Sequence, residues 1–484
     1  MKKKTLILYV YLKNKKIKFL KILIIIIFYL LNLDNKIIQN IDNNLCEELD
    51  PMNVYINILN SKPKILCENE ISQHICYQHN YSFFQIHKGV ICMMKNFYIN
   101  ISNWKEDGYV YNGPVNKKTK GVPLINNGFF NMNCKVKNNI SNFSSIYKSY
   151  FQSWKYYSEQ NNPFNQEKNI EELAPGKTIF IFSRNQDSPN LLIGGAEIIN
   201  ALTLMKLMKL KAENIQILFL ESIKINNDPY YNLYKNIISR GSEPLHIRNL
   251  SSKKIYHISN AIHIPINWDS PVFCKTKIPN CNVKSKAYSE LYYSIFKYLK
   301  ITSFIDNTNK DKDAYFYPKS FTNSKLNLYK KYLTIQWRKP WPKTRKGQER
   351  IFGNAKEIVE KLDSVLRNKK ILIRLVDTAM LPIETQISLM QKTDYFLGIH
   401  GAGIFLSIFL PSKSIVHEIK SKERLTPNRP QIAAIISGHK VYSDFFNIII
   451  KKIEFQETYF VDKNELTKRV IKIMKENNFF NENI

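Results

Sequence analysis

Short apolar runs alternate with helical patterns through the C-terminal part of the chain. Buried strands are predicted at residues 332–337, 371–376, 395–399 and 414–419. Helices are predicted at residues 354–367, 384–391, 404–410 and 465–475. In the first of these helices Ile358, Leu362 and Val365 recur at spacings that place them on one face. Strands that alternate with helices in this way predict a parallel, doubly wound sheet for residues 326–484.

The same alternation occurs upstream, in residues 166–325. A strand predicted at 178–182, a helix at 197–210 and a strand at 215–220 have the spacing of a βαβ unit. The polar run 306–313 then interrupts the pattern, as is typical of a linker or surface loop. The predicted fold class is therefore α/β, with two Rossmann-like halves.

Residues 34–165 show neither pattern. They are rich in Asn, Tyr and Phe and hold five of the seven cysteines. We predict an irregular region of loops and short strands there, preceding the two halves.

The first 33 residues have the pattern of a targeting segment. Lysines crowd the first 21 residues, and residues 22–33 are apolar and uncharged. This order is typical of a secretory signal or a signal anchor. No A-x-A cleavage site follows, which favours a single-pass anchor with the basic end in the cytosol. The apolar run is shorter than the roughly 20 residues of a full span, so a cleaved signal peptide stays an alternative.

Sequons and cysteines agree with a lumenal location. N-x-[ST] sequons occur at Asn80, Asn100, Asn139, Asn142 and Asn249. No cysteine pair has the C-x-x-C spacing of a zinc site, so we expect no metal site and interpret the cysteines as disulfide partners. Cys274 and Cys281 are close enough in sequence for a local bridge, and the sequence leaves the other pairings open.

The net charge of +31 does not predict a nucleic-acid partner. Lys, Asn and Ile are abundant in apolar and polar segments alike, which indicates a general compositional bias. The chain has no zinc-finger or RRM signature and no basic helix with interleaved aromatic residues. We relate the net charge to solubility, and we expect no nucleic acid among the partners.

The chain has only 15 glycines, yet Gly398, Gly401 and Gly403 fall close together in the segment LGIHGAG. A parallel strand followed by a tight turn into a helix presents backbone N–H groups and the helix dipole to an anion. Glycine there lets the backbone approach a phosphate closely. The spacing alone fits a tight turn packed on the sheet equally well, and His400 fits a buried core histidine.

The neighbouring residues carry a more specific signal. QISLM at 386–390, LGIHGAG at 397–403, FLP at 409–411 and IVHEI at 415–419 follow one another in order. This order resembles the glycosyltransferases of family 61, whose hallmark is Q-I-x-L-M, an acidic residue, G-V-H-G-A-G, F-L-P and I-E-I. Arg338, Arg350 and the segment from Asn354 also resemble the family's S-R and R-x-I-x-N-x-x-E-I-V segment. The resemblance covers residues 330–445 well and residues 175–330 weakly.

The resemblance implies a GT-B fold, in which the C-terminal domain holds a nucleotide sugar and the acceptor enters from the N-terminal side. It implies a UDP-sugar donor and a glycoprotein or glycan acceptor. No cofactor is required, and whether a divalent metal assists stays open. The donor-binding residues by this correspondence are Arg338, Arg350, His400, Gly401, Ala402, Gly403 and Glu418. Arg338 and Arg350 would neutralise the diphosphate, and Glu418 would accept hydrogen bonds from ribose.

The catalytic base must come from elsewhere. Glu197 follows Gly194 and Gly195 at the predicted start of a helix, and Asp187 is the second candidate. The equally open alternative is that Glu197 only favours its helix N-terminus. Thr385 and the Gly194–Gly195 pair depart from the family pattern, which leaves the acceptor side in doubt.

Two rival interpretations follow from these residues. Asp311 and Asp313 have the D-x-D spacing of metal-dependent transferases, but they lie in a polar stretch typical of a solvated loop. The departures from the family pattern also fit a non-catalytic glycan- or nucleotide-binding protein. We expect an inverting transferase in the Golgi or endoplasmic reticulum membrane, type II, using GlcNAc or xylose.

Overall fold

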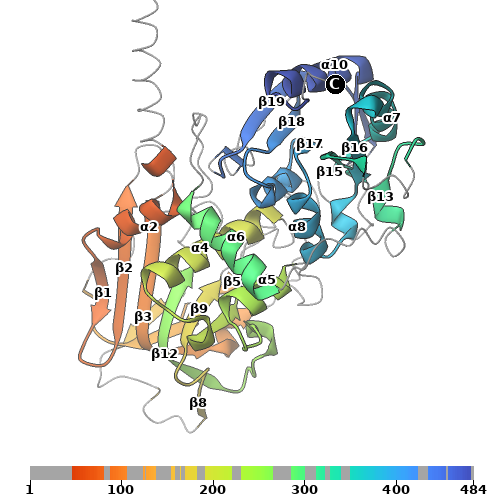
Figure 1. Ribbon diagram of the computed structural model, residues 1–484. Coiled ribbons are helices and arrows are strands. Elements are labelled where there is room, and N and C mark those ends of the chain that lie inside the picture. The colour runs from red at the N-terminus through yellow and green to blue at the C-terminus, as the bar shows by residue number, and fades with distance from the viewer. Residues whose placement is uncertain are drawn as a thin grey trace, which may run out of the picture.

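The structure is a computed structural model of the 484-residue chain. It describes residues 46–48, 50–80, 88–105, 124–125, 127–137, 154–157, 164, 169–182, 191–220, 230–264, 285–299, 312–321, 328–339, 349–422, 434–435, 437–453 and 456–480. The chain forms a mixed α/β structure in which two large sheets lie apart, with α4, α6 and α8 between them (Figure 1).

The first sheet has ten strands in the order β1-β2-β3-β12-β9-β10-β11, with β6, β7 and β8 joined at its side. Their bounds are β1 Lys64–Glu68, β2 Gln73–Asn80, β3 Lys88–Asn100, β6 Phe130–Asn133, β7 Trp154–Tyr157, β8 Ile170–Glu172, β9 Thr178–Phe182, β10 Ile215–Phe219, β11 Leu245–His246 and β12 Ile255–Ile264. The strands from β1 to β12 pair antiparallel, and those from β12 to β11 pair parallel. Only part of this sheet therefore has Rossmann-like pairing.

The prediction of an irregular region at residues 34–165 needs correction. β2 and the 13-residue β3 come from it, and β3 pairs with β12 along most of its length. The pattern was hidden because polar residues such as His74 and Asn131 are buried in this sheet beside apolar ones. A strand that buries polar side chains loses the clean alternation by which half-buried strands are identified.

The second sheet has six strands in the order β13-β16-β14-β17-β18-β19. Their bounds are β13 Tyr315–Phe316, β14 Lys331–Gln336, β16 Ile371–Val376, β17 Tyr395–Ile399, β18 Ile415–Ser421 and β19 Lys440–Phe446. All neighbours pair parallel except β13 with β16. The prediction of a parallel sheet is confirmed, with the four predicted strands at β14, β16, β17 and β18; β13 and β19 were not predicted.

Helices fill the space between the sheets and cover the second sheet. Their bounds are α2 Pro51–Leu59, α4 Leu191–Leu207, α5 Tyr231–Leu233, α6 Lys286–Leu299, α7 Ala355–Leu366, α8 Ile383–Gln391, the 3₁₀ helix η15 Ala402–Phe409 and α10 Lys463–Glu476. Small sheets are formed by β4 Trp104–Lys105 with β5 Leu124–Ile125, and by β15 Glu349–Phe352, β20 Ile448–Ile453 and β21 Gln456–Val461. The predicted buried face of α7 is partly wrong, because Val365 is exposed and Leu366 is buried instead.

Three apolar cores follow from this arrangement. The central core joins α2, α4 and α6 on the first sheet to α8 and η15 on the second. A second core lies on the other face of the first sheet, under β6 and β7. A third packs α7 and α10 on the other face of the second sheet. Since apolar burial is the main favourable term in folding, the continuous central core holds the two sheets together.

Gly195 of α4 marks a close contact within the central core. A β-carbon at this position would lie 2.2 Å from a ring carbon of Phe405 in η15. The glycine pair that departs from the family pattern therefore permits close packing of α4 on η15.

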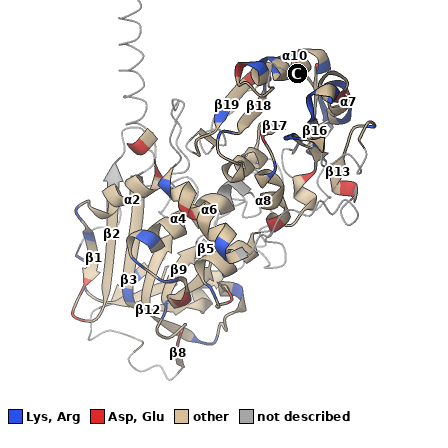
Figure 2. Ribbon diagram, viewed as in Figure 1, with Lys and Arg blue, Asp and Glu red and all other residues tan. Residues whose placement is uncertain are grey.

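Two disulfides are described, Cys67–Cys134 and Cys76–Cys92. The predicted pair Cys274–Cys281 and the targeting segment 1–33 lie outside the described residues. None of the helices in the described part of the chain is long and apolar enough to cross a membrane. Lysine and arginine residues are distributed over many elements of both halves (Figure 2).

Candidate functional site

The second sheet contains a topological switch point between β14 and β17. In chain order its parallel strands are β14, β16, β17, β18 and β19, and β14 lies between β16 and β17. The chain therefore leaves β14 towards one edge of the sheet and later returns to its other side. Ligands of open α/β sheets bind outside the carboxyl ends of the strands at such a point. Here those ends carry Arg338, just beyond β14, and His400, which follows β17 directly.

Two arginines converge on the backbone at this point. Arg338 donates from Nη1 to the carbonyl oxygen of His400 at 3.3 Å, and Arg350 donates from Nη1 to the same oxygen at 2.8 Å. Arg350 comes from β15, and the amide of Phe352 in that strand donates to the Arg338 carbonyl at 3.0 Å. The sequence-predicted pair of arginines is thus brought together, although 12 residues separate them in the chain. The two guanidinium groups concentrate positive charge at this point, and planar guanidinium groups are suited to binding carboxylates and phosphates.

The glycines of LGIHGAG make this convergence possible. A β-carbon on Gly401 would lie 2.1 Å from Nη1 of Arg338. A β-carbon on Gly403 would lie 1.6 Å from Nε2 of Gln336, the last residue of β14. Side chains at either position would displace the residues that surround the turn. The glycines therefore allow Arg338 and Gln336 to approach the backbone of the turn closely. The helix η15 begins at the same turn, at Ala402, with its first-turn amides directed out of the helix.

His400 and Glu418 form a buried pair. Nδ1 of His400 lies 2.5 Å from Oε1 of Glu418, and Glu418 is fully buried. The other carboxylate oxygen lies 3.5 Å from Nζ of Lys420, which is also buried. An ionised carboxylate only accepts hydrogen bonds, so Nδ1 carries the proton and Nε2 keeps the lone pair.

The location of Glu418 differs from the prediction. It was expected near the end of its strand, but it lies inside β18, opposite Gly398 of β17. Gly398 has no side chain, and Ile404 and Gln336 pack against the strand there: a β-carbon on Gly398 would lie 2.8 Å from Cδ1 of Ile404 and 3.2 Å from Oε1 of Gln336. The described contacts of Glu418 orient His400, and ribose binding by Glu418 stays a prediction.

Several charges act on the pKa of His400. Burial lowers this pKa because it disfavours the imidazolium ion. The hydrogen bond and charge of Glu418 oppose that effect, and the charges of Arg350 and Lys420 lower the pKa further. The imidazole is accordingly neutral near pH 7, with a carboxylate next to it that would stabilise a proton if an anion were bound nearby.

The two candidate bases are not brought to this site by any described contact. Glu197 lies in the second turn of α4 and is 1% exposed, and Oη of Tyr234 donates to its Oε2 at 2.9 Å. The structure thus places Glu197 inside the core and not at the start of the helix as expected. Asp187 lies outside the described residues.

Three polar residues near the carboxyl ends of the strands were missed by sequence reasoning. Gln336 ends β14 and touches the glycine turn, Lys420 faces Glu418, and Asp377 directly follows β16. Burial raises the pKa of Asp377, and the charge of Lys339 partly opposes this. These residues could have been found by one feature of the sequence, a polar residue at or just after the end of a predicted buried strand.

The D-x-D pair has no described role in this site. Asp313 is exposed in a short 3₁₀ turn at Lys312–Ala314, and Asp311 lies outside the described residues. Thr385 lies on α8, where the neighbouring Glu384 accepts from Nδ2 of Asn232 at 3.2 Å.

The sequence was compared with models of known protein families. The family model described as Glycosyltransferase 61 matches residues 133–417, which is more than half of the chain. The matched range ends within β18 and includes Arg338, Arg350 and His400. No curated protein matches the sequence.

Proposed function

The chain belongs to glycosyltransferase family 61, and on that premise we propose that it is an inverting transferase that uses a UDP-sugar. The sugar, GlcNAc or xylose, would be moved to a hydroxyl of a glycoprotein or glycan. The acceptor oxygen forms a bond to the anomeric carbon while the bond from that carbon to the diphosphate breaks. The acceptor proton goes to a base, and UDP leaves as the anion.

The observation that carries this proposal is the convergence of Arg338 and Arg350 on the carbonyl of His400. The leaving diphosphate gains negative charge in the transition state, and preorganised cations stabilise that charge without further reorganisation. The amides at the start of η15 add donors at the same point. The site therefore supports departure of a diphosphate from a sugar.

The neutral imidazole of His400 fits the same role. An anion bound next to Nε2 raises the pKa of His400, because it favours the imidazolium ion. Glu418 already stabilises the proton on Nδ1. His400 would then donate to a phosphate oxygen from Nε2 and accept the charge that the leaving group brings.

We infer a GT-B arrangement from the two sheets and their helices. The second sheet would bind the donor, and the first would contribute the acceptor side. The N-terminal 33 residues would anchor the protein as a type II protein in the Golgi or endoplasmic reticulum membrane. The basic, then apolar, order of that segment supports this placement.

Transfer of a labelled sugar tests the function directly. The purified chain is incubated with a panel of UDP-sugars, and donor hydrolysis or transfer is read by mass spectrometry. Arg338→Ala and His400→Ala are compared with Arg367→Ala, an exposed arginine at the end of α7. We expect the first two variants to lose turnover and the third to keep it. Unchanged turnover in Arg338→Ala and His400→Ala would remove the proposed donor site.

A second candidate function is a binding protein without turnover. It is favoured by the burial of Glu197 beside Tyr234, because a buried carboxylate cannot reach an acceptor hydroxyl in this conformation. Calorimetry with UDP separates the two functions. A binding protein takes up UDP and releases no sugar from any donor, and Glu197→Gln leaves its UDP affinity unchanged.

A further inference from the structure

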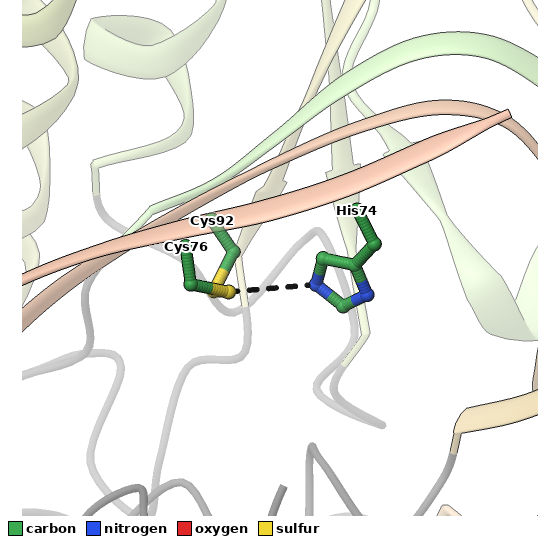
Figure 3. Close-up of side chains that lie close together, drawn as sticks. All are labelled: His74, Cys76 and Cys92. Carbon is green, nitrogen blue, oxygen red and sulfur yellow. Dashed lines mark hydrogen bonds between the residues drawn. A yellow bond between two sulfur atoms is a disulfide. The ribbon is translucent and has the colours of Figure 1, made fainter. Parts of the chain in front are cut away.

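The first sheet holds a second cluster of buried reactive side chains, far in sequence from the donor site. Cys76 of β2 and Cys92 of β3 are register partners in antiparallel strands, and they are joined as a disulfide with a Cα–Cα distance of 4.1 Å. His74 lies two residues before Cys76, so the strand directs both side chains to the same face. Figure 3 shows the imidazole pointing at the disulfide. All three side chains are buried.

The distances within this cluster suit a metal ion. Nε2 of His74 lies 3.6 Å from Sγ of Cys76, and the three ligand atoms all lie within 4.8 Å of one another. A tetrahedral zinc ion with a Zn–S bond of about 2.3 Å and a Zn–N bond of about 2.1 Å holds its S and N ligands about 3.6 Å apart. Two zinc-bound sulfurs lie about 3.8 Å apart. The imidazole is therefore already placed, and only the sulfurs have to separate.

The surroundings of His74 also suit a ligand. Its Nδ1 lies 3.0 Å from the hydroxyl of Tyr156, which fixes the ring and leaves Nε2 towards the sulfurs. Metal-bound histidines almost always have such a partner on the other nitrogen. The imidazole is buried and directs Nε2 at the sulfur of Cys76. The ring of Trp154 covers it, with a centroid distance of 4.3 Å.

His263 of β12 is the register partner of Cys92, and it is buried. Among the described residues, the group of ligand atoms close enough for one ion is made of His74, Cys76 and Cys92, without His263. An imidazole and two thiolates leave one position open on a tetrahedral ion, as in zinc sites with three protein ligands.

We propose that His74, Cys76 and Cys92 form a redox-gated site for Zn²⁺ or a cation of similar softness. In the oxidised form the disulfide closes the site. A dithiol reductant breaks the S–S bond by two thiol–disulfide exchange steps; it is oxidised to its own disulfide and leaves a thiol on Cys76 and a thiol on Cys92. Metal binding then releases both thiol protons to solvent, and the two thiolates and the His74 imidazole bind the cation. The compartment's redox state therefore decides between a disulfide and a metal clip across β2 and β3.

The test uses the full chain and a phosphine reductant, which takes oxygen from water and leaves no competing thiol. Reduced and oxidised protein are mixed with Zn²⁺ and desalted, and bound metal is measured by mass spectrometry. Co²⁺ serves as a second probe, since thiolate-to-cobalt charge transfer gives a characteristic near-ultraviolet absorption. We expect stoichiometric metal in the reduced chain alone, together with a higher Tm on adding Zn²⁺.

Matched variants separate this site from any other thiol. Cys67→Ser with Cys134→Ser removes the other described disulfide and should leave metal uptake unchanged. His74→Asn should abolish the cobalt–thiolate spectrum, and Tyr156→Phe should weaken Zn²⁺ binding about 10-fold or more. Absence of uptake by the reduced chain overturns the proposal, as does equal uptake by His74→Asn. A reduced chain that unfolds and stays unfolded with Zn²⁺ overturns it as well.

Discussion

Two buried histidine clusters in this protein differ in how their charge is controlled. His74, on the first sheet, lies among cysteines and aromatic rings, and burial alone is the main cause of its pKa of about 3. His400, on the second sheet, is also buried, but Glu418 next to it partly offsets the effect of burial. One imidazole is kept neutral by an apolar environment, and the other is set between a carboxylate and two cations.

The difference shows which of the two histidines can take up a proton when an anion binds nearby. A histidine with a carboxylate on one nitrogen accepts a proton at moderate cost when an anion arrives. A histidine surrounded by apolar groups cannot do so and suits a neutral role, such as metal ligation. This contrast supports the proposal of diphosphate binding at the second sheet and of a redox-gated site in the first.

Replacing the carboxylate of Glu418 is the test of this comparison for which we expect the largest effect. Glu418→Gln leaves the buried Lys420 ammonium without its carboxylate, at a cost of about 3–5 kcal/mol in the free energy of unfolding. Glu357→Gln is the matched control, because Glu357 pairs with Lys463 on the surface. Urea unfolding should show a large loss for the first variant and almost none for the second. Equal losses would contradict the proposed role of the buried pair.

Acid should act mainly through the first sheet. Burial lowers the pKa of both His74 and His263 to about 3, whereas the unfolded chain binds these protons near pH 6.5. The unfolded state therefore binds more protons between these pH values, and stability falls as pH falls through this window. Each histidine contributes on the order of 1.4 kcal/mol per pH unit.

Urea unfolding between pH 7 and pH 5 measures this slope. His74→Gln should remove about one proton from the difference in proton binding between the two states. A variant whose slope equals that of the unmodified chain would show that His74 is not buried in its neutral form.

Removing one cation tests the other cluster. Arg350→Ala should lower kcat/KM for sugar transfer about 100-fold, because a preorganised donor at the developing charge is lost. It should also raise the pKa of His400, since the charge of Arg350 lowers that pKa. Kinetics and histidine NMR titration measure the two effects. A loss of activity without any shift at His400 would separate the arginine from the histidine pair.

The glycine turn allows a smaller and sharper test. Gly403→Ala brings a β-carbon onto Nε2 of Gln336, and we expect a cost of about 1–2 kcal/mol in stability, as for overpacking elsewhere. Adding Gln336→Ala removes the clash and should restore the stability. Thermal unfolding of both single variants and the double variant gives the coupling energy. Additive losses would show that the two residues do not touch.

Much of the second sheet could be predicted from sequence. Four of its strands are apolar runs that alternate with helices, and each lies within two residues of the predicted bounds. The first sheet could not be predicted in the same way. Its strands β2 and β3 carry histidine, glutamine and lysine among apolar residues, and long-range antiparallel pairing with β12 decides which of these are buried.

The residues of the proposed donor site were predictable only in part. The glycines, His400 and Arg338 were found because they sit in one recognisable order along the chain. Glu418 was found as a residue, but its buried contact with His400 was not predicted, because the pairing of β17 with β18 brings the two side chains together. Gln336 and Lys420 were missed, because a polar residue in a strand acquires meaning only from the turn or carboxylate that it faces.

The sequence by itself determined the family, the parallel sheet and the glycine turn, because these depend on local periodicity and on residues adjacent in the chain. It did not group His74 with Cys76 and Cys92, because no C-x-x-C spacing links these residues. Only the tertiary structure placed the three side chains together, because pairing of β2 with β3 fixes which side chains share a face. It also decided that Glu197 is buried and that two arginines meet at one carbonyl.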